Sequence, residues 1–407
     1  MNVSGQSMAL QSAVMLPVLI ALSATHLLND MIQSLIPAIY PIIKSVYGLD
    51  FGQVGMITLT FQITASLLQP AVGYYTDRNP MPYSMVIGMG SSLLGLLGLA
   101  YAGSYSLLLV AAAFVGLGSS IFHPEATRMA RSASGGRHGF AQGVFQVGGQ
   151  SGSALGPVLA AFIIVPFGQT SIAWFSVAAL VAMMLMVWTA RTFARVQRAH
   201  AATVASAPKP VRNVTPESAP VGSSVLFSLV ILMVLLFSKS AYSSSFNSFY
   251  TFYLIHKFGV SVQASQMMLF LFLAAAAAGT LGGGILGDKI GRKNIIWFSI
   301  LGALPFTLIL PFANLFWTGV LTVVINLIMS SAFAAILIYA IELLPRRAGM
   351  IGGLFYGLSF GLGGLAAVIL GEMADYVGIE MLFRICAFLP AIGLLAWFLP
   401  SLRSNVR

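Results

Sequence analysis

One pattern of residues decides the fold, because the chain repeats it 211 residues further on. Residues 47–78 read YGLDFGQVGMITLTFQITASLLQPAVGYYTDR, and residues 258–289 read FGVSVQASQMMLFLFLAAAAAGTLGGGILGDK. The corresponding positions are Tyr47, Gly48, Met56, Phe61, Ala65, Gly73, Asp77 and Arg78 in the first copy and Phe258, Gly259, Met267, Phe272, Ala276, Gly284, Asp288 and Lys289 in the second. A repeat of half the chain is far longer than a solenoid unit. It predicts two homologous halves of the kind that enclose a solute pathway in a membrane.

The composition excludes a soluble globular protein, since 58% of the residues are hydrophobic and only 7% are charged. A helix needs about 20 mainly apolar residues to cross a bilayer. The first and seventh stretches of this kind are long, which predicts tilt or short end pieces. The chain is therefore predicted to be an all-α, polytopic membrane protein with twelve spans: 13–43, 51–76, 82–103, 106–130, 138–166, 170–192, 223–256, 262–287, 293–312, 315–342, 347–376 and 379–401.

The spans divide into two groups of six around a polar segment rich in Pro, Ala, Ser and basic residues. This predicts an N-terminal half (1–192), a cytoplasmic linker (193–222) and a C-terminal half (223–407). The 20 Lys and Arg residues fall on the side of the two termini, except for Lys44, Lys239, Lys257 and Arg384. The positive-inside rule then places both termini in the cytoplasm. The net charge of +10 indicates contact with anionic membrane lipid and not with nucleic acid.

A charged motif follows the eighth span and reads Gly284-x-x-x-Asp288-Lys289-x-Gly291-Arg292-Lys293. The first half keeps the matching Gly73-x-x-x-Asp77-Arg78 and then diverges. This resembles the loop signature of the major facilitator superfamily, and together with the repeat the resemblance covers essentially the whole chain. It implies two pseudo-symmetric six-helix halves and a secondary transporter.

Charged residues at the cytoplasmic ends of spans form two groups. An Asp at a helix end beside basic residues can pair with a neighbouring helix and release it, which makes a gate. The predicted gate clusters are Asp77, Arg78, Glu125 and Arg128 in one half and Asp288, Arg292, Glu342 and Arg346 in the other. His123 precedes Pro124 and Glu125 and is assigned to the first cluster or to a structural role, with a function in the transport pathway as the alternative. The alternative is that all these charges are solvated and individually worth little.

The fifth span carries small residues at fixed spacing: Gly143, Gly152, Gly156-Pro157 and then Ala160-Ala161. This resembles the antiporter signature of proton-coupled drug exporters in the superfamily, with alanine in place of its last two glycines. The resemblance favours export.

Few ionisable residues lie deep in the spans, where an unpaired charge is costly and normally faces a partner or a wet cavity. His26 and Asp30 are four residues apart and share a helix face. We expect Asp30, with His26, to carry the coupling proton. Lys239 is expected either to attract an anionic substrate or to neutralise Asp30, and a purely structural ion pair is the alternative. The neutral residues expected beside the substrate are Gln62, Gln142, Gln146 and Asn247.

The sequence contains no Walker-type phosphate loop, nucleophile elbow or zinc-binding motif. We therefore expect no enzyme activity, cofactor or metal. Several runs, among them His26–Ser34 and Phe122–Glu125, resemble bacterial antibiotic exporters of the superfamily. This implies a monomeric inner-membrane protein that exports a small anionic drug in exchange for protons. The alternatives are proton-coupled import of a small organic anion or another metabolite and, remotely, a membrane enzyme or sensor.

Overall fold

The computed structural model describes residues 15–78, 81, 83–135, 138–204, 223–344 and 348–400. Within these ranges the regular structure is entirely helical, with no strand. Twelve segments in them are long and apolar enough to cross a membrane. The predicted all-α, twelve-span architecture is confirmed.

The first half begins with a span that breaks in two at Ile39, where Pro41 starts a second short helix and Gly48, at φ 63°, ends it. The predicted first stretch therefore has a short end piece. Proline also interrupts the fifth span, where α7 gives way to the π-helical turn η1. The elements are α2 (Leu16–Ala38), α3 (Tyr40–Tyr47), α4 (Phe51–Arg78), α5 (Ser84–Tyr101), α6 (Tyr105–Ser132), α7 (His138–Leu159), η1 (Ala160–Ile164), α8 (Val165–Phe167), η2 (Gln169–Phe175) and α9 (Ser176–Val204).

The second half begins with α10, a single helix of 36 residues. At 1.5 Å per residue it is about 54 Å long. This is longer than the hydrocarbon core is thick, so the helix must tilt or its ends must protrude. Its elements are α10 (Ser223–Phe258), α11 (Val262–Ile290), α12 (Arg292–Leu301), α13 (Leu304–Ile309), η3 (Leu310–Phe312), α14 (Leu315–Ser330), α15 (Ala332–Leu343), α16 (Ala348–Val377), α17 (Ile379–Cys386) and η5 (Leu389–Phe398).

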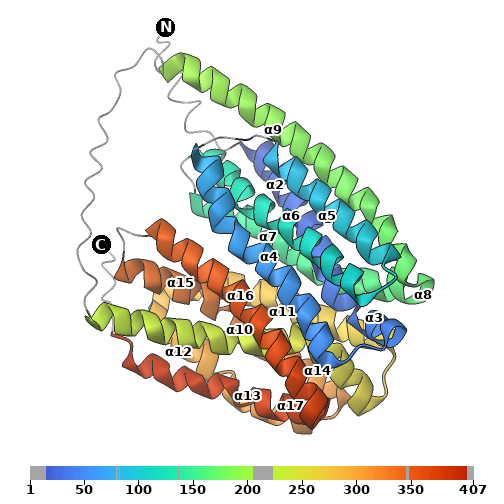
Figure 1. Cartoon of the computed structure of the whole chain (residues 1–407). Helices are drawn as coiled ribbons and strands as arrows, with labels where there is room; N and C mark the ends of the chain where they lie inside the picture. The colour runs from blue at the N-terminus through green and yellow to red at the C-terminus, as the bar shows by residue number, and fades with distance from the viewer. Residues whose placement is uncertain are drawn as a thin grey trace.

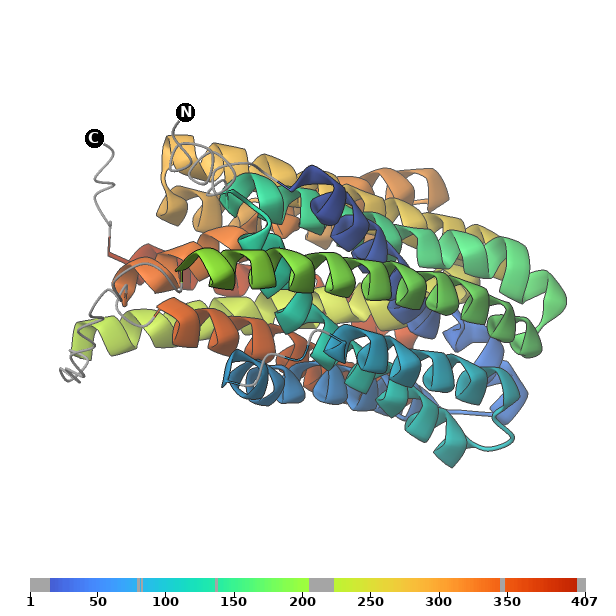
Figure 2. The ribbon, with the colours of Figure 1, turned by 90° about the horizontal axis from the view of Figure 1, so that it is seen from above.

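The helices form two groups that follow the order of the chain. Figure 1 shows residues 16–204 in blue to green on one side and residues 223–398 in yellow-green to red on the other. Seen from above in Figure 2, the helices run roughly along one common direction. Within the first group α2 packs on α7, and α6 packs on α4 and α5. Between the groups, α4 packs on α16 and α7 packs on α11.

The bundle has two ends, which we name by what they hold. The terminal end holds the first and last described residues, Met15 beside Ala133 and Pro400 beside Tyr339. The far end holds α3 and α8 (Figure 1).

Side chains of the second half join the two halves at the far end. The carboxylate of Asp375 accepts hydrogen bonds from the backbone nitrogens of Phe51 (2.9 Å) and Gly52 (2.7 Å). Gln263 Nε2 donates to the carbonyl of Ala161 at 3.0 Å, and Gln266 Nε2 donates to that of Ala38 at 2.6 Å.

The α4–α16 contact loosens towards the terminal end. A Cβ placed on Gly371 would overlap the backbone of Phe51, and one placed on Gly364 would press on Leu59. Further along α16, a Cβ on Gly361 would have only Ser66 at 3.9 Å, and one on Gly357 would meet no atom within 4 Å. The halves are thus closed together at the far end and separate from each other towards the terminal end.

Candidate functional site

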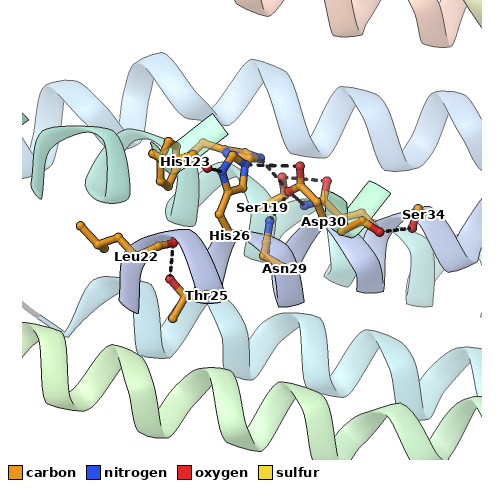
Figure 3. A network of polar contacts seen from close by, with 11 residues as sticks. Leu22, Thr25, His26, Asn29, Asp30, Ser34, Ser119 and His123 are labelled. Carbon is orange, nitrogen blue, oxygen red and sulfur yellow. Dashed lines mark hydrogen bonds and ion pairs between the residues drawn. The ribbon is translucent and has the colours of Figure 1, made fainter. Parts of the chain in front are cut away.

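A cluster of three ionisable residues lies where α2 meets α6 (Figure 3). His26 Nε2 lies 3.3 Å from Asp30 Oδ2, and His123 Nε2 lies 3.8 Å from Asp30 Oδ1. The side chain of His26 is 4% exposed, that of Asp30 19% and that of His123 21%. We call these three residues the Asp30 cluster. The structure thus brings together the predicted pair His26 and Asp30 and adds His123.

Neutral donors complete the surroundings of Asp30. Its Oδ1 atom accepts hydrogen bonds from Asn29 Nδ2 (2.9 Å) and Gln33 Nε2 (3.2 Å). Ser119 Oγ, on α6, donates to Gln33 Oε1 at 3.1 Å. Helix α6 therefore reaches the network at two positions one turn apart, Ser119 and His123.

The His26 ring is held in one orientation by Phe145 of α7. The two rings stack with their centroids 4.0 Å apart, and His26 Nδ1 lies 2.8 Å from the Phe145 carbonyl oxygen. Because a carbonyl only accepts, Nδ1 carries a hydrogen, and Nε2 of a neutral His26 has only a lone pair to present to Asp30. Two lone pairs at 3.3 Å repel each other, so a cation must be shared between His26 and Asp30 for this contact to hold. A proton is sufficient.

The same three side chains could hold a metal ion by distance alone, since their ligand atoms lie within 4.8 Å of one another. However, Asp30 Oδ1 already accepts two amide hydrogens, from Asn29 and Gln33. A shared proton needs no further change in these contacts.

Glycines on α7 make the close approach to α2 possible. A Cβ on Gly149 would overlap the His26 ring and lie 2.9 Å from Asp30 Oδ2. Cβ atoms on Gly152 and Gly156 would overlap Leu27 and Ser34 of α2, whereas one on Gly143 would meet no atom within 4 Å. Two of the three predicted antiporter-type glycines thus form the contact with α2. Small residues pack helices closely in membranes in this way.

The predicted substrate-binding residues come from three helices. Lys239 and Asn247 lie on α10, Gln62 on α4 and Gln146 on α7, and all four are half-buried. The buried Oε1 atom of Gln62 has no hydrogen-bond partner in the described part of the chain. The side chain of Gln142 lies outside the described residues.

Half of the predicted gate residues form ion pairs. On α6, Arg128 Nη2 lies 2.5 Å from Glu125 Oε2, and Glu125 is buried. Between α12 and α15, Arg292 Nε lies 2.6 Å from Glu342 Oε1. The side chains of Asp77, Arg78 and Asp288, and all of Arg346, lie outside the described residues.

The sequence pattern places His123 beside the gate and gives no role to Asn29, Gln33, Ser119 and Gly149. The signals that could have found them are local. Asn29 and Gln33 flank Asp30 on α2, and Ser119 and His123 have the four-residue spacing of one helix face. Which helix that face meets is decided by packing.

Comparison with known proteins agrees with this architecture. The sequence model of the Major Facilitator Superfamily matches residues 22–366 and, in a second match, 232–406. The chain is 56% identical to the fosmidomycin resistance protein of Escherichia coli (strain K12), over 94% of this chain and 92% of that protein. It is 40% identical to the uncharacterized MFS-type transporter YfnC of Bacillus subtilis (strain 168), over 95% and 93%.

Solved structures share the fold at low identity. A bacterial homologue of the human lysosomal transporter Spinster, inward-facing and occupied, aligns with a TM-score of 0.69 and 16% identity over 94% of both chains. The nucleoside transporter NupG aligns with a TM-score of 0.71 and 12% identity over 93% of this chain and 97% of that one. With the family match across both halves, these findings establish that the chain is a multi-pass membrane transporter of the major facilitator superfamily.

Proposed function

We propose that this protein exports small anionic drugs, fosmidomycin among them, across the bacterial inner membrane in exchange for protons. The observation that carries this proposal is the 56% identity, over 94% of the chain, to a protein named for fosmidomycin resistance. At that level of similarity the pathway residues of the two proteins should largely correspond.

The charge distribution supports an anionic substrate. Fosmidomycin is a small phosphonate with a hydroxamate group, so its binding requires a positive side chain in the pathway. Lys239 is half-buried in α10 of the second half, while Asp30 contacts basic side chains of its own half, His26 and His123. This arrangement favours a substrate role for Lys239 over charge balance of Asp30. Gln62, Gln142, Gln146 and Asn247 would supply neutral hydrogen bonds.

The Asp30 cluster supports proton coupling. With the His26 ring fixed by Phe145, one shared proton would stabilise the 3.3 Å contact to Asp30. Loss of that proton would make the contact repulsive, at the point where Gly149 of α7 lies against both side chains. Asp30 and His26 would thus bind and release the proton, and the close α2–α7 contact would weaken when the proton leaves.

The remaining assignments follow the charge pattern and the repeat. We propose that the terminal end faces the cytoplasm, that residues 1–192 and 223–407 move as two units joined by a linker at 193–222, and that the protein works as a monomer in anionic lipid. The pairs Glu125–Arg128 and Arg292–Glu342 would belong to the cytoplasmic gate, together with Asp77, Arg78, Asp288 and Arg346.

Purified protein in liposomes tests the direction of coupling, with the membrane potential clamped at zero. A carrier is reversible, so its orientation in the vesicle does not affect the sign of coupling. An antiporter accumulates radiolabelled fosmidomycin when the lumen is more acidic than the medium. For one proton per molecule the ratio approaches about tenfold per pH unit, because one unit corresponds to about 1.36 kcal/mol. Fosmidomycin flux that does not depend on the pH gradient would refute the proposal.

Proton-coupled import is the second candidate, and the same vesicles distinguish it. A symporter accumulates its substrate only when the medium is the acidic side. Recovery of unaltered fosmidomycin from the lumen would oppose the remote alternative of a membrane enzyme.

A further inference from the structure

We propose that His123 is the residue through which the proton on the Asp30 cluster controls the Glu125–Arg128 ion pair. This inference rests on the proposed proton exchange and extends it. It makes His123 a positioning residue, acting through Asp30 on one side and through helix α6 on the other.

His123 is the member of the cluster that belongs to a different helix from Asp30. Its Nε2 atom lies 3.8 Å from Asp30 Oδ1, and its ring meets that of His26 edge-on, with centroids 5.2 Å apart and planes at 79°. The two histidines approach different oxygens of one carboxylate. Asp30 can therefore share a proton with His26 on α2 through Oδ2 or, when the longer hydrogen bond from Gln33 to Oδ1 (3.2 Å) gives way, with His123 on α6.

The two contacts differ in length, and this difference links the location of the proton to the distance between α2 and α6. At 3.3 Å the His26–Asp30 contact is close to a hydrogen bond, whereas 3.8 Å between His123 and Asp30 is too long for one. To reach hydrogen-bond length the two atoms must come closer by roughly 0.6–1 Å, and an approach of α6 to α2 supplies this without changing either side-chain conformation. A proton that moves from the His26 side to the His123 side thus favours the approach of the two helices.

Helix α6 carries that movement directly to the gate. Glu125 lies two residues beyond His123, and Arg128 three further on. Pro124 lies between His123 and Glu125 and removes one backbone hydrogen bond of the helix, which makes this turn easier to bend. In the described part of the chain, Glu125 Oε1 and Arg128 Nε have no hydrogen-bond partner. The pair can thus accept another partner when α6 shifts.

The other elements packed on α2 offer no competing charge within the described residues. Helix α7 contributes the Phe145 carbonyl and Gly149 at this level. The sequence of α5 contains no charged residue. On α9, the described arginine side chains, Arg191 and Arg195, are exposed, and on α3, Lys44 donates to the Leu49 carbonyl. Helix α4, which packs on α6, has Asp77 and Arg78 at its end as its charged residues, and their side chains lie outside the described residues. Among the side chains that the structure describes, His26, Asp30 and His123 are therefore the groups available to the proton.

The test compares His123→Gln with wild type and with His256→Gln in the same liposomes. Glutamine can still donate to Asp30 but cannot bind a proton, and His256 is an exposed histidine paired with Glu380 at the far end. Two transport modes are measured. Gradient-driven accumulation of fosmidomycin requires proton coupling, and counterflow of labelled against unlabelled fosmidomycin, without a gradient, does not.

His123→Gln is expected to keep counterflow within about twofold of wild type and to lose the accumulation of about tenfold per pH unit. Its counterflow should also lose the dependence on pH that wild type and His256→Gln show. Full accumulation by His123→Gln would overturn the role of His123. Equal loss of counterflow and accumulation, in correctly inserted protein, would show a structural role and would also overturn it. Absence of coupling in wild type would instead refute the proposed function itself.

Discussion

Asp375 caps a helix that belongs to the other half of the molecule: its Oδ2 atom lies 2.7 Å from the backbone nitrogen of Gly52, in the first turn of α4. The same carboxylate accepts from Phe51 at 2.9 Å. A helix start has unpaired backbone N–H groups and a partial positive charge, so an Asp is well suited to that place. The closure of the far end therefore depends on a contact that must break before the halves can separate there.

Replacing Asp375 with alanine should favour opening at the far end. Loss of an N-terminal cap costs about 1 kcal/mol, or about a fivefold shift in population. Spin labels at two exposed positions, Val46 and Tyr376, would report the shift as longer distances, with Cys386 replaced by alanine. Glu380→Gln, which removes a nearby acid that pairs with His256, is the control. An unchanged distance distribution would argue against the cap as a gate.

Two glycines of α7 should respond in opposite ways to alanine. Gly149→Ala places a methyl group against His26 and Asp30 and should abolish gradient-driven fosmidomycin accumulation and lower the Tm. Gly143→Ala meets open space and should keep transport, with an equal or higher Tm because alanine favours a helix by about 0.5–1 kcal/mol. Accumulation assays and thermal unfolding in detergent measure both. Similar behaviour of the two variants would contradict the close packing of α7 on α2 at Gly149.

Asp30→Asn should uncouple transport from the proton gradient. The amide cannot take up a proton from His26, yet it retains the size of the carboxylate and can still accept from Asn29. We expect counterflow to persist while fosmidomycin in acid-lumen vesicles only reaches its external concentration, because uncoupled transport equilibrates the drug without concentrating it. Retained accumulation would eliminate Asp30 as the proton carrier.

Lys239→Ala should weaken binding of anionic substrates more than that of neutral ones. Lys239→Arg, which keeps the charge, should retain most of the affinity for fosmidomycin. Half-maximal concentrations for counterflow of fosmidomycin and of an uncharged ester of it provide the comparison. Equal losses for both compounds would indicate that Lys239 serves the structure and not the substrate.

Removal of metal ions should leave transport unchanged, although the Asp30 cluster has the residue types of a metal site. A single proton satisfies the His26–Asp30 contact. Accumulation measured with and without EDTA in all buffers checks this. Loss of activity with EDTA that zinc restores would show that a metal ion, and not a proton, occupies the cluster.

The sequence predicts the fold well because spans are long and their apolar composition is strong. It does not locate the break at Ile39 or the π-helical turn at Ala160–Ile164, since proline perturbs a helix without dictating which residue bends. The residues of the Asp30 cluster also differ in how far the sequence predicts them. His26 and Asp30 share a face through helical spacing alone, whereas the approach of His123 depends on how α6 packs against α2, which no local pattern encodes.

The hydrogen bonds described at the far end are unequal in origin. The second half contributes the side chains of Asp375, Gln263 and Gln266, and their partners in the first half are main-chain atoms. Most substitutions of the first-half partners keep these main-chain atoms, with the exception of Gly52, where a Cβ would overlap the Glu372 carboxylate. The second half can therefore retune these three contacts by its own side chains, whereas the 3.1 Å contact between Thr58 Oγ1 and Ser248 Oγ takes a side chain from each half. An evolving or engineered carrier can therefore change how readily the far end opens without altering the residues around Asp30.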